Sequence, residues 1–209
     1  MIGYNKKKST LLERDIEITQ SYLKNNYNEL KACNDTYLGI SKVYKLINLK
    51  RLKSVFLSYT FSLSNYLASY CTLIDHMIRA RNRLNNNQIK NEYQTKLKKS
   101  RLIEENKFVI DFRNYILHVK MPVVGAGFDF IVPGNGLKPG TGPSEIKDFS
   151  LSVKKEDLLN WDGWTKESLA YINGVPVGID NQIFLQPLIN NLHQSLLQFC
   201  DWFKYRISI

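Results

Sequence analysis

Apolar residues recur every three or four positions through most of the chain, which is the spacing of helices that bury one face. Four segments show it: 9–30, 43–84, 88–120 and 183–207. The two most regular stripes consist of Phe56, Tyr59, Leu63, Tyr66, Leu67, Tyr70, Ile74, Met77 and Ile78, and of Leu185, Leu188, Leu192, Leu196, Phe199 and Phe203. Because each stripe needs an apolar partner, the pattern predicts helices packed around a shared core.

Turn-forming residues separate these segments. Asn34 and Asp35 predict a turn within 31–42, and the three asparagines of NRLNNNQ end the second helix. The third helix is expected to be interrupted near Ser100. Pro122 ends it, because the residue before a proline is pushed away from helical backbone angles.

Residues 122–182 interrupt the helical pattern and are rich in proline and glycine at their start. FDFIV and DFSLSV flank the loop PGNGLKPGTGPS and predict a small β-hairpin, and KKEDLLN and WTKESLAYI predict short helices. We therefore predict an all-α fold, an antiparallel helical bundle forming one domain over 1–209. Residues 1–42 form an N-terminal helical extension, and 122–182 form a Gly/Pro-rich insert, with its hairpin, before the last helix.

The chain is basic, with 29 Lys and Arg against 19 Asp and Glu, a formal net charge of +10. This balance suits a polyanionic partner such as RNA, DNA or an anionic membrane surface. A general preference for lysine in the composition explains the same charge without any partner. The charge therefore admits a nucleic-acid partner but does not identify one.

Two features bear on the compartment. Cys33, Cys71 and Cys200 are odd in number and lack CxxC spacing, which disfavours a disulfide framework or a zinc site and fits a reducing cytoplasm. Residues 54–74 carry no charge and are long enough to span a bilayer, but they include five Ser, two Thr and one Asn. We expect a buried helix of a cytoplasmic protein rather than a membrane span.

The stretch DFRNYILHVKMP, residues 111–122, holds the candidate chemistry. On a helix, Asn114 and His118 lie one turn apart on one face, and the long side chain of Arg113 can swing toward the same side. Histidine exchanges protons near neutral pH, and a guanidinium can hold two phosphoryl oxygens. His118 near a helix C-terminus also gains stability as imidazolium. This set suits RNA cleavage without a metal ion or cofactor, in which the ribose 2′-hydroxyl attacks the adjacent phosphorus.

The Arg-x4-His spacing with asparagine after the arginine, in RNYILH, resembles the signature of HEPN domains, and Lys120, Pro122 and the helical context agree with it. The resemblance implies a four- or five-helix bundle, commonly a homodimer whose two motif helices form one cleft. It implies a metal-independent endoribonuclease of toxin–antitoxin, abortive-infection or phage-defence systems, with an antitoxin protein as a possible partner. The carried-over catalytic residues are Arg113 and His118, with Asn114 in support.

Other interpretations of the same residues stay open. If the motif is structural, we expect Arg113 to form an ion pair with Asp111, Glu104 or Glu105, and His118 to cap the end of its helix. An inactive HEPN-like module that binds RNA or a protein is the alternative to an enzyme.

Further candidate RNA-binding residues lie outside the motif. They are Lys120 and, beside Asp75 and His76, the row Arg79, Arg81 and Arg83. The basic run 90–101 is either a guide for a nucleic-acid backbone or an ordinary solvated surface.

Overall fold

The structure is a computed structural model that describes residues 2–41, 49–118, 124–131 and 145–208. The helices are α1 (Ile2–Ser41), α2 (Leu49–Arg83), α3 (Asn87–Lys99), α4 (Leu102–His118), α5 (Lys155–Leu159), α6 (Lys166–Gly174) and α7 (Leu185–Ser208). The strands are β1 (Val124–Ile131), β2 (Glu145–Lys154) and β3 (Gln182–Phe184).

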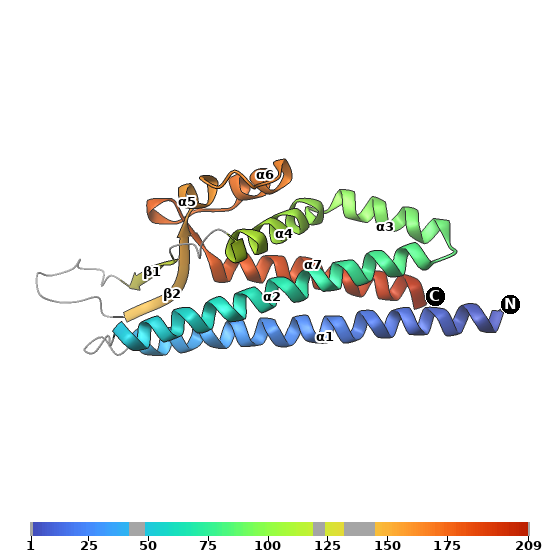
Figure 1. Ribbon diagram of the computed structural model, residues 1–209, viewed down its shortest axis with the longest axis horizontal. Coiled ribbons are helices and arrows are strands. Elements are labelled where there is room, and N and C mark those ends of the chain that lie inside the picture. The colour runs from blue at the N-terminus through green and yellow to red at the C-terminus, as the bar shows by residue number, and fades with distance from the viewer. Residues whose placement is uncertain (1, 42–48, 119–123, 132–144, 209) are drawn as a thin grey trace, which may run out of the picture.

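The molecule is an elongated helical bundle, as predicted (Figure 1). Helices α1 and α2 run antiparallel along the whole length, and α7 packs against α1. Helices α3 and α4 return over α2 and α7 as two consecutive segments. The motif helix α4 therefore packs on the bundle and is not an appendage.

The core is made by the predicted stripes. Every residue of the α7 stripe is buried, and so is most of the α2 stripe, from Tyr59 to Met77. Helix α1 contributes Leu12, Ile16, Leu23 and Leu30 to the same core. Ile78, at the end of the α2 stripe, is instead 36% exposed.

The first helix is longer than predicted at both ends, because α1 runs from Ile2 to Ser41 whereas the pattern predicted a helix over 9–30. The turn predicted within 31–42 is wrong, because α1 continues without a break to Ser41. Asn34 faces the interior and is buried, so tertiary packing overrides its turn preference. The break near Ser100 is confirmed: it caps the C-terminus of α3, and α4 begins at Leu102.

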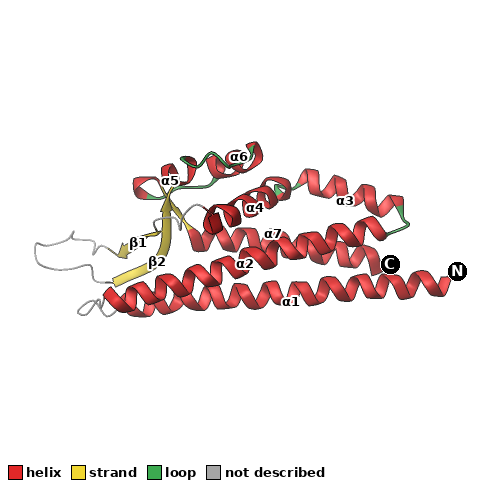
Figure 2. Cartoon of the chain, viewed as in Figure 1, coloured by secondary structure: helices red, strands yellow, loops and turns green. Residues whose placement is uncertain are grey.

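The predicted hairpin is confirmed, since β1 pairs antiparallel with β2. The sheet has a third strand that the sequence did not predict, β3, which pairs with the end of β2 immediately before α7. Figure 2 shows the strands together at one end of the bundle, with α5 next to the end of β2 and α6 lying over α4. The predicted loop 133–144 and Pro122 lie outside the described residues.

Aromatic side chains fix α6 and the turn before it onto the motif helix. Phe108 stacks on Trp164 and contacts Tyr171, with ring centroids 5.9 and 4.8 Å away, and Tyr115 lies against Trp161 at 5.4 Å. This contact holds the described part of the insert against the same helix that carries the motif.

The described helices include none that is long and apolar enough to cross a membrane. The uncharged run 54–74 lies on α2, with one side buried in the core and residues such as Phe61 exposed on the other. All three cysteines are free thiols.

Candidate active site

The motif occupies the C-terminal third of α4. Arg113 and Asn114 are half-buried, which leaves both in reach of solvent. Neither has a hydrogen-bond or ion-pair partner within the described part of the chain. His118 is the last residue of α4, but its side chain lies outside the described part, as does Lys120.

Arg113 lies on the side of α4 that faces α2. Burial raises the pKa of the Cys71 thiol to about 11, the nearby Arg113 guanidinium opposes the shift, and the Asp75 carboxylate adds to it. Two turns before Arg113, on the same side of α4, Asn106 accepts a hydrogen bond from the Tyr70 hydroxyl at 3.2 Å, which joins α2 to α4. Arg113 therefore lies near the part of α2 that carries Cys71 and Asp75.

The structural explanation of Arg113, an ion pair with a nearby acid, is wrong. Glu104 pairs with Arg101 at 3.4 Å. Glu105 accepts a hydrogen bond from Ser195 at 3.4 Å. Asp111 faces another direction altogether, so none of the three acids neutralises the guanidinium.

Asp111 joins α4 to the start of α6. One carboxylate oxygen accepts hydrogen bonds from the backbone N–H of Thr165 at 2.9 Å, its hydroxyl at 2.8 Å and the Ser168 hydroxyl at 2.6 Å. The carboxylate is buried at the N-terminus of α6, where unpaired N–H groups and the helix dipole favour negative charge. Asp111 thus has a structural role beside the motif.

The helix geometry separates the two proposed catalytic positions. Five residues along an α-helix correspond to a rotation of roughly 140° between Arg113 and position 118. Position 118 follows Asp111 by two turns, on the side of α4 toward the insert. The two groups therefore flank a face of α4 rather than sharing one line along it.

The face between them carries an exposed apolar row. Ile103, Ile110 and Leu117 are 38, 39 and 51% exposed and recur every seven residues. Leu117 therefore points outward, whereas Phe112 is fully buried. An exposed apolar row beside polar motif residues is typical of a surface that contacts another molecule.

The arginine row of α2 does not join the motif. His76, Arg79 and Arg83 line a small depression of about 150 Å³ together with Leu12 and Asp15 of α1. Arg81 lies over the ring of Tyr93 in α3, 5.2 Å from its centroid. These side chains occupy the end of α2 next to α3, whereas Arg113 lies toward the opposite end of α4 (Figure 1).

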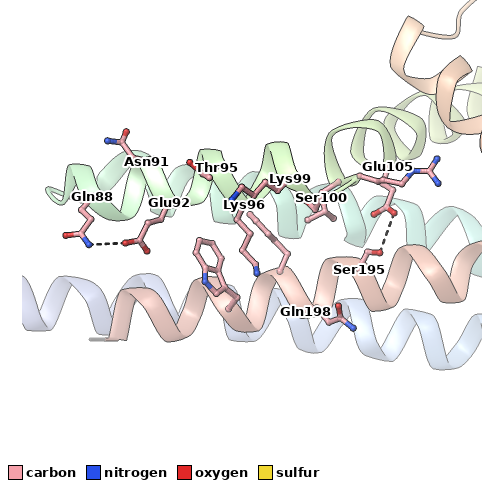
Figure 3. Close-up of a pocket in the computed structure, with 14 residues that line it drawn as sticks. Gln88, Asn91, Glu92, Thr95, Lys96, Lys99, Ser100, Glu105, Ser195 and Gln198 are labelled. Carbon is pink, nitrogen blue, oxygen red and sulfur yellow. Dashed lines mark hydrogen bonds between the residues drawn. The ribbon is translucent and has the colours of Figure 1, made fainter.

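The basic run 90–101 contributes to a groove of about 970 Å³ between α3, the start of α4 and α7 (Figure 3). Lys96 and Lys99 line it from α3, and Ser195, Phe199 and Trp202 line it from α7. Glu105 lies at its inner end, 7% exposed. Burial raises the pKa of this carboxyl, and Ser195 and Arg101 oppose that shift.

The sequence pattern did not identify Glu105 or Trp202 as site residues. Glu105 resembles any acidic residue in the first turn of a helix, and Trp202 lies beside the α7 stripe rather than on it. Only the packing of α3, α4 and α7 brings them to one groove.

Comparison with known proteins gives no relatives: no family model, curated protein or solved structure matches this chain.

Proposed function

We propose that this protein is a metal-independent endoribonuclease of the HEPN type, acting through Arg113 and His118. The observation that carries the proposal is the half-buried Arg113 guanidinium, which forms no ion pair within the described part of the chain. An unpaired guanidinium, close in sequence to Asn114 and His118, suits the binding of a phosphate group.

The chemistry assigns a separate task to each residue. His118 takes the proton from the ribose 2′-hydroxyl or gives one to the leaving 5′ oxygen, since its ordinary pKa lies near neutrality. Arg113 stabilises the charge that builds on the phosphoryl oxygens, and Asn114 donates a hydrogen bond to the phosphate or orients the imidazole. The products carry a 2′,3′-cyclic phosphate, or its hydrolysis product, and a 5′-hydroxyl.

A homodimer would complete this site. The rotation of roughly 140° between Arg113 and position 118 makes it difficult for one helix to hold a single phosphate with both groups. Two antiparallel copies of α4 that cross near Leu117, with Ile110 at the edge of the contact, would bring the Arg113 of one protomer toward the His118 position of its partner. A two-fold dimer of this kind is the commonest form of oligomer.

The test is RNA cleavage by the purified protein in EDTA. We expect wild-type protein to cleave, and His118→Ala and Arg113→Ala each to lose activity by a factor of about 100 or more. His76→Ala is the matched control and should cleave like wild type, because His76 lines the depression next to α1. Equal activity of wild type and His118→Ala would contradict the proposal, and RNA binding without any cleavage would favour the non-catalytic module.

A further inference from the structure

The groove between α3, α4 and α7 has an electrostatic character that suits a polyanion. Of its acidic side chains, Glu92 is paired with Arg206 through two contacts of 2.8 and 2.9 Å. Lys99 has no partner in the described part of the chain, and Lys96 contacts only the ring of Trp202. Two lysines therefore remain available to a ligand along one wall.

The opposite wall offers a surface for stacking. Trp202 is half-buried on α7 and packs against Phe199 and Phe203 with centroid distances of 5.6 and 6.4 Å. The Lys96 ammonium lies 5.1 Å from its ring centroid. A base that stacks on this indole would displace the flexible lysine, whose charge then remains within reach of a nearby phosphate.

The inner end of the groove holds an unsatisfied acceptor. Glu105 is 7% exposed, and one carboxyl oxygen, Oε1, accepts the hydrogen bond from Ser195. The other oxygen, Oε2, is buried and has no partner in the described part of the chain. Buried polar atoms are nearly always paired, so an unpaired oxygen on a side chain that lines the groove indicates a missing donor.

We propose that this groove binds a short single-stranded RNA segment, with one base stacked on Trp202, phosphates held by Lys96 and Lys99, and an amino group of another base donating to Glu105. This inference rests on RNA as the proposed substrate but does not depend on cleavage. Ser195, which contacts Glu105, and Trp202 are seven residues apart on α7, about 10 Å along the helix. That distance assigns the two contacts to different nucleotides.

The Glu105 contact selects among bases. A carboxylate accepts a hydrogen bond from the N4 amino group of cytosine, whereas uracil presents the O4 acceptor at the same place. Cytosine and uracil are otherwise similar in size and shape. The groove should therefore bind cytosine-containing strands more tightly than uracil-containing strands.

The experiment is fluorescence anisotropy with labelled 2′-O-methyl hexanucleotides of cytosine or uracil, which 2′-hydroxyl attack cannot cleave. We expect wild-type protein to bind the cytosine strand roughly 10-fold more tightly at pH 7.5. Trp202→Leu should weaken the binding of both oligonucleotides at least 5-fold, because base stacking is lost. Glu105→Gln should keep cytosine binding and reduce the preference to less than about 2-fold, since an amide can donate to uracil as well.

Adjacent lysines provide the matched control. Lys99→Ala should weaken binding several-fold and lower the salt dependence, whereas Lys98→Ala, equally basic but outside the groove, should bind like wild type. Equal losses in the two lysine variants, or no binding of either strand by folded wild-type protein, would overturn the inference. Equal binding of a polyglutamate peptide would also overturn it in favour of an acidic protein partner. Loss of cleavage in His118→Ala with intact hexanucleotide binding would leave this groove standing.

Discussion

At the scale of single residues, His193 shows how burial makes a histidine unsuitable as a proton carrier. Its ring stacks on Tyr27, with centroids 3.9 Å apart and planes within 6°. Burial lowers the pKa of His193 to about 4, and the charge of Lys24 adds to the shift. The imidazole is therefore neutral near pH 7, which makes it a packing residue of α7 rather than a proton carrier.

The lowered pKa predicts a stability change with pH. Between pH 6.5 and 4 the unfolded chain binds a proton at His193 that the folded chain does not, so the free energy of unfolding falls as pH falls. The loss at pH 4 is on the order of 3 kcal/mol at most. His193→Phe keeps an aromatic ring against Tyr27 but cannot titrate. Urea unfolding at several pH values should show a smaller acid loss in this variant, and an unchanged acid loss would contradict the assignment.

At the scale of elements, the attachment of α6 to α4 depends on one carboxylate. Asp111 satisfies the N–H of Thr165 and two hydroxyls that have become buried at the start of α6. Around it, Phe108 and Tyr115 pack against the tryptophans of the insert. The insert is thus coupled to the motif helix two residues before Arg113.

Asp111→Ala should destabilise the protein by about 2–4 kcal/mol, because it leaves buried donors unpaired. The exposed Asp162, on the loop before α6, supplies the control Asp162→Ala, for which we expect a change within about 0.5 kcal/mol. Chemical unfolding measures both. A loss of the same small size in the two variants would show that the Asp111 contacts contribute little.

Periodicity predicted the elements whose stripes are buried, and it failed where packing alone decides. The stripes of α2 and α7 and the break at Ser100 were predictable, because each depends on local spacing or capping. The continuation of α1 past Asn34 was not, since burial in the core outweighs a turn preference. In the candidate site, Arg113 was proposed from the sequence alone, whereas the exposure of Leu117 and the role of Asp111 depend on which neighbours cover α4.

At the scale of the whole molecule, the proposed site requires two chains. Ile103, Ile110 and Leu117 form an exposed row on the side of α4 opposite its contact with α7. A second exposed apolar region lies on the α1–α2 hairpin and includes Phe61, which is 68% exposed. The two protomers could therefore meet through the α4 row or through the α1–α2 hairpin, and substitutions in each region distinguish the two arrangements.

If the proposed dimer forms through α4, Ile110→Asp should convert it to a folded monomer and abolish RNA cleavage, because the substitution places a charge within the α4 interface. Phe61→Asp is the control and should stay dimeric and active. Light scattering after size-exclusion chromatography gives the mass, and circular dichroism confirms folding. Dissociation by Phe61→Asp, with Ile110→Asp unaffected, would place the interface on the α1–α2 hairpin instead.

The most direct test of 2′-hydroxyl attack assisted by Arg113 and His118 is the chemistry of the cut. An RNA that the protein cleaves, and a copy with a single 2′-deoxyribose before the scissile phosphate, are each incubated with the protein in EDTA. The chemical groups at the ends of the products are then identified by mass spectrometry. We predict a 2′,3′-cyclic phosphate and a 5′-hydroxyl from the RNA and no cut at the deoxy position. Cleavage of the deoxy copy at that position, or products with a 5′-phosphate, would contradict the mechanism.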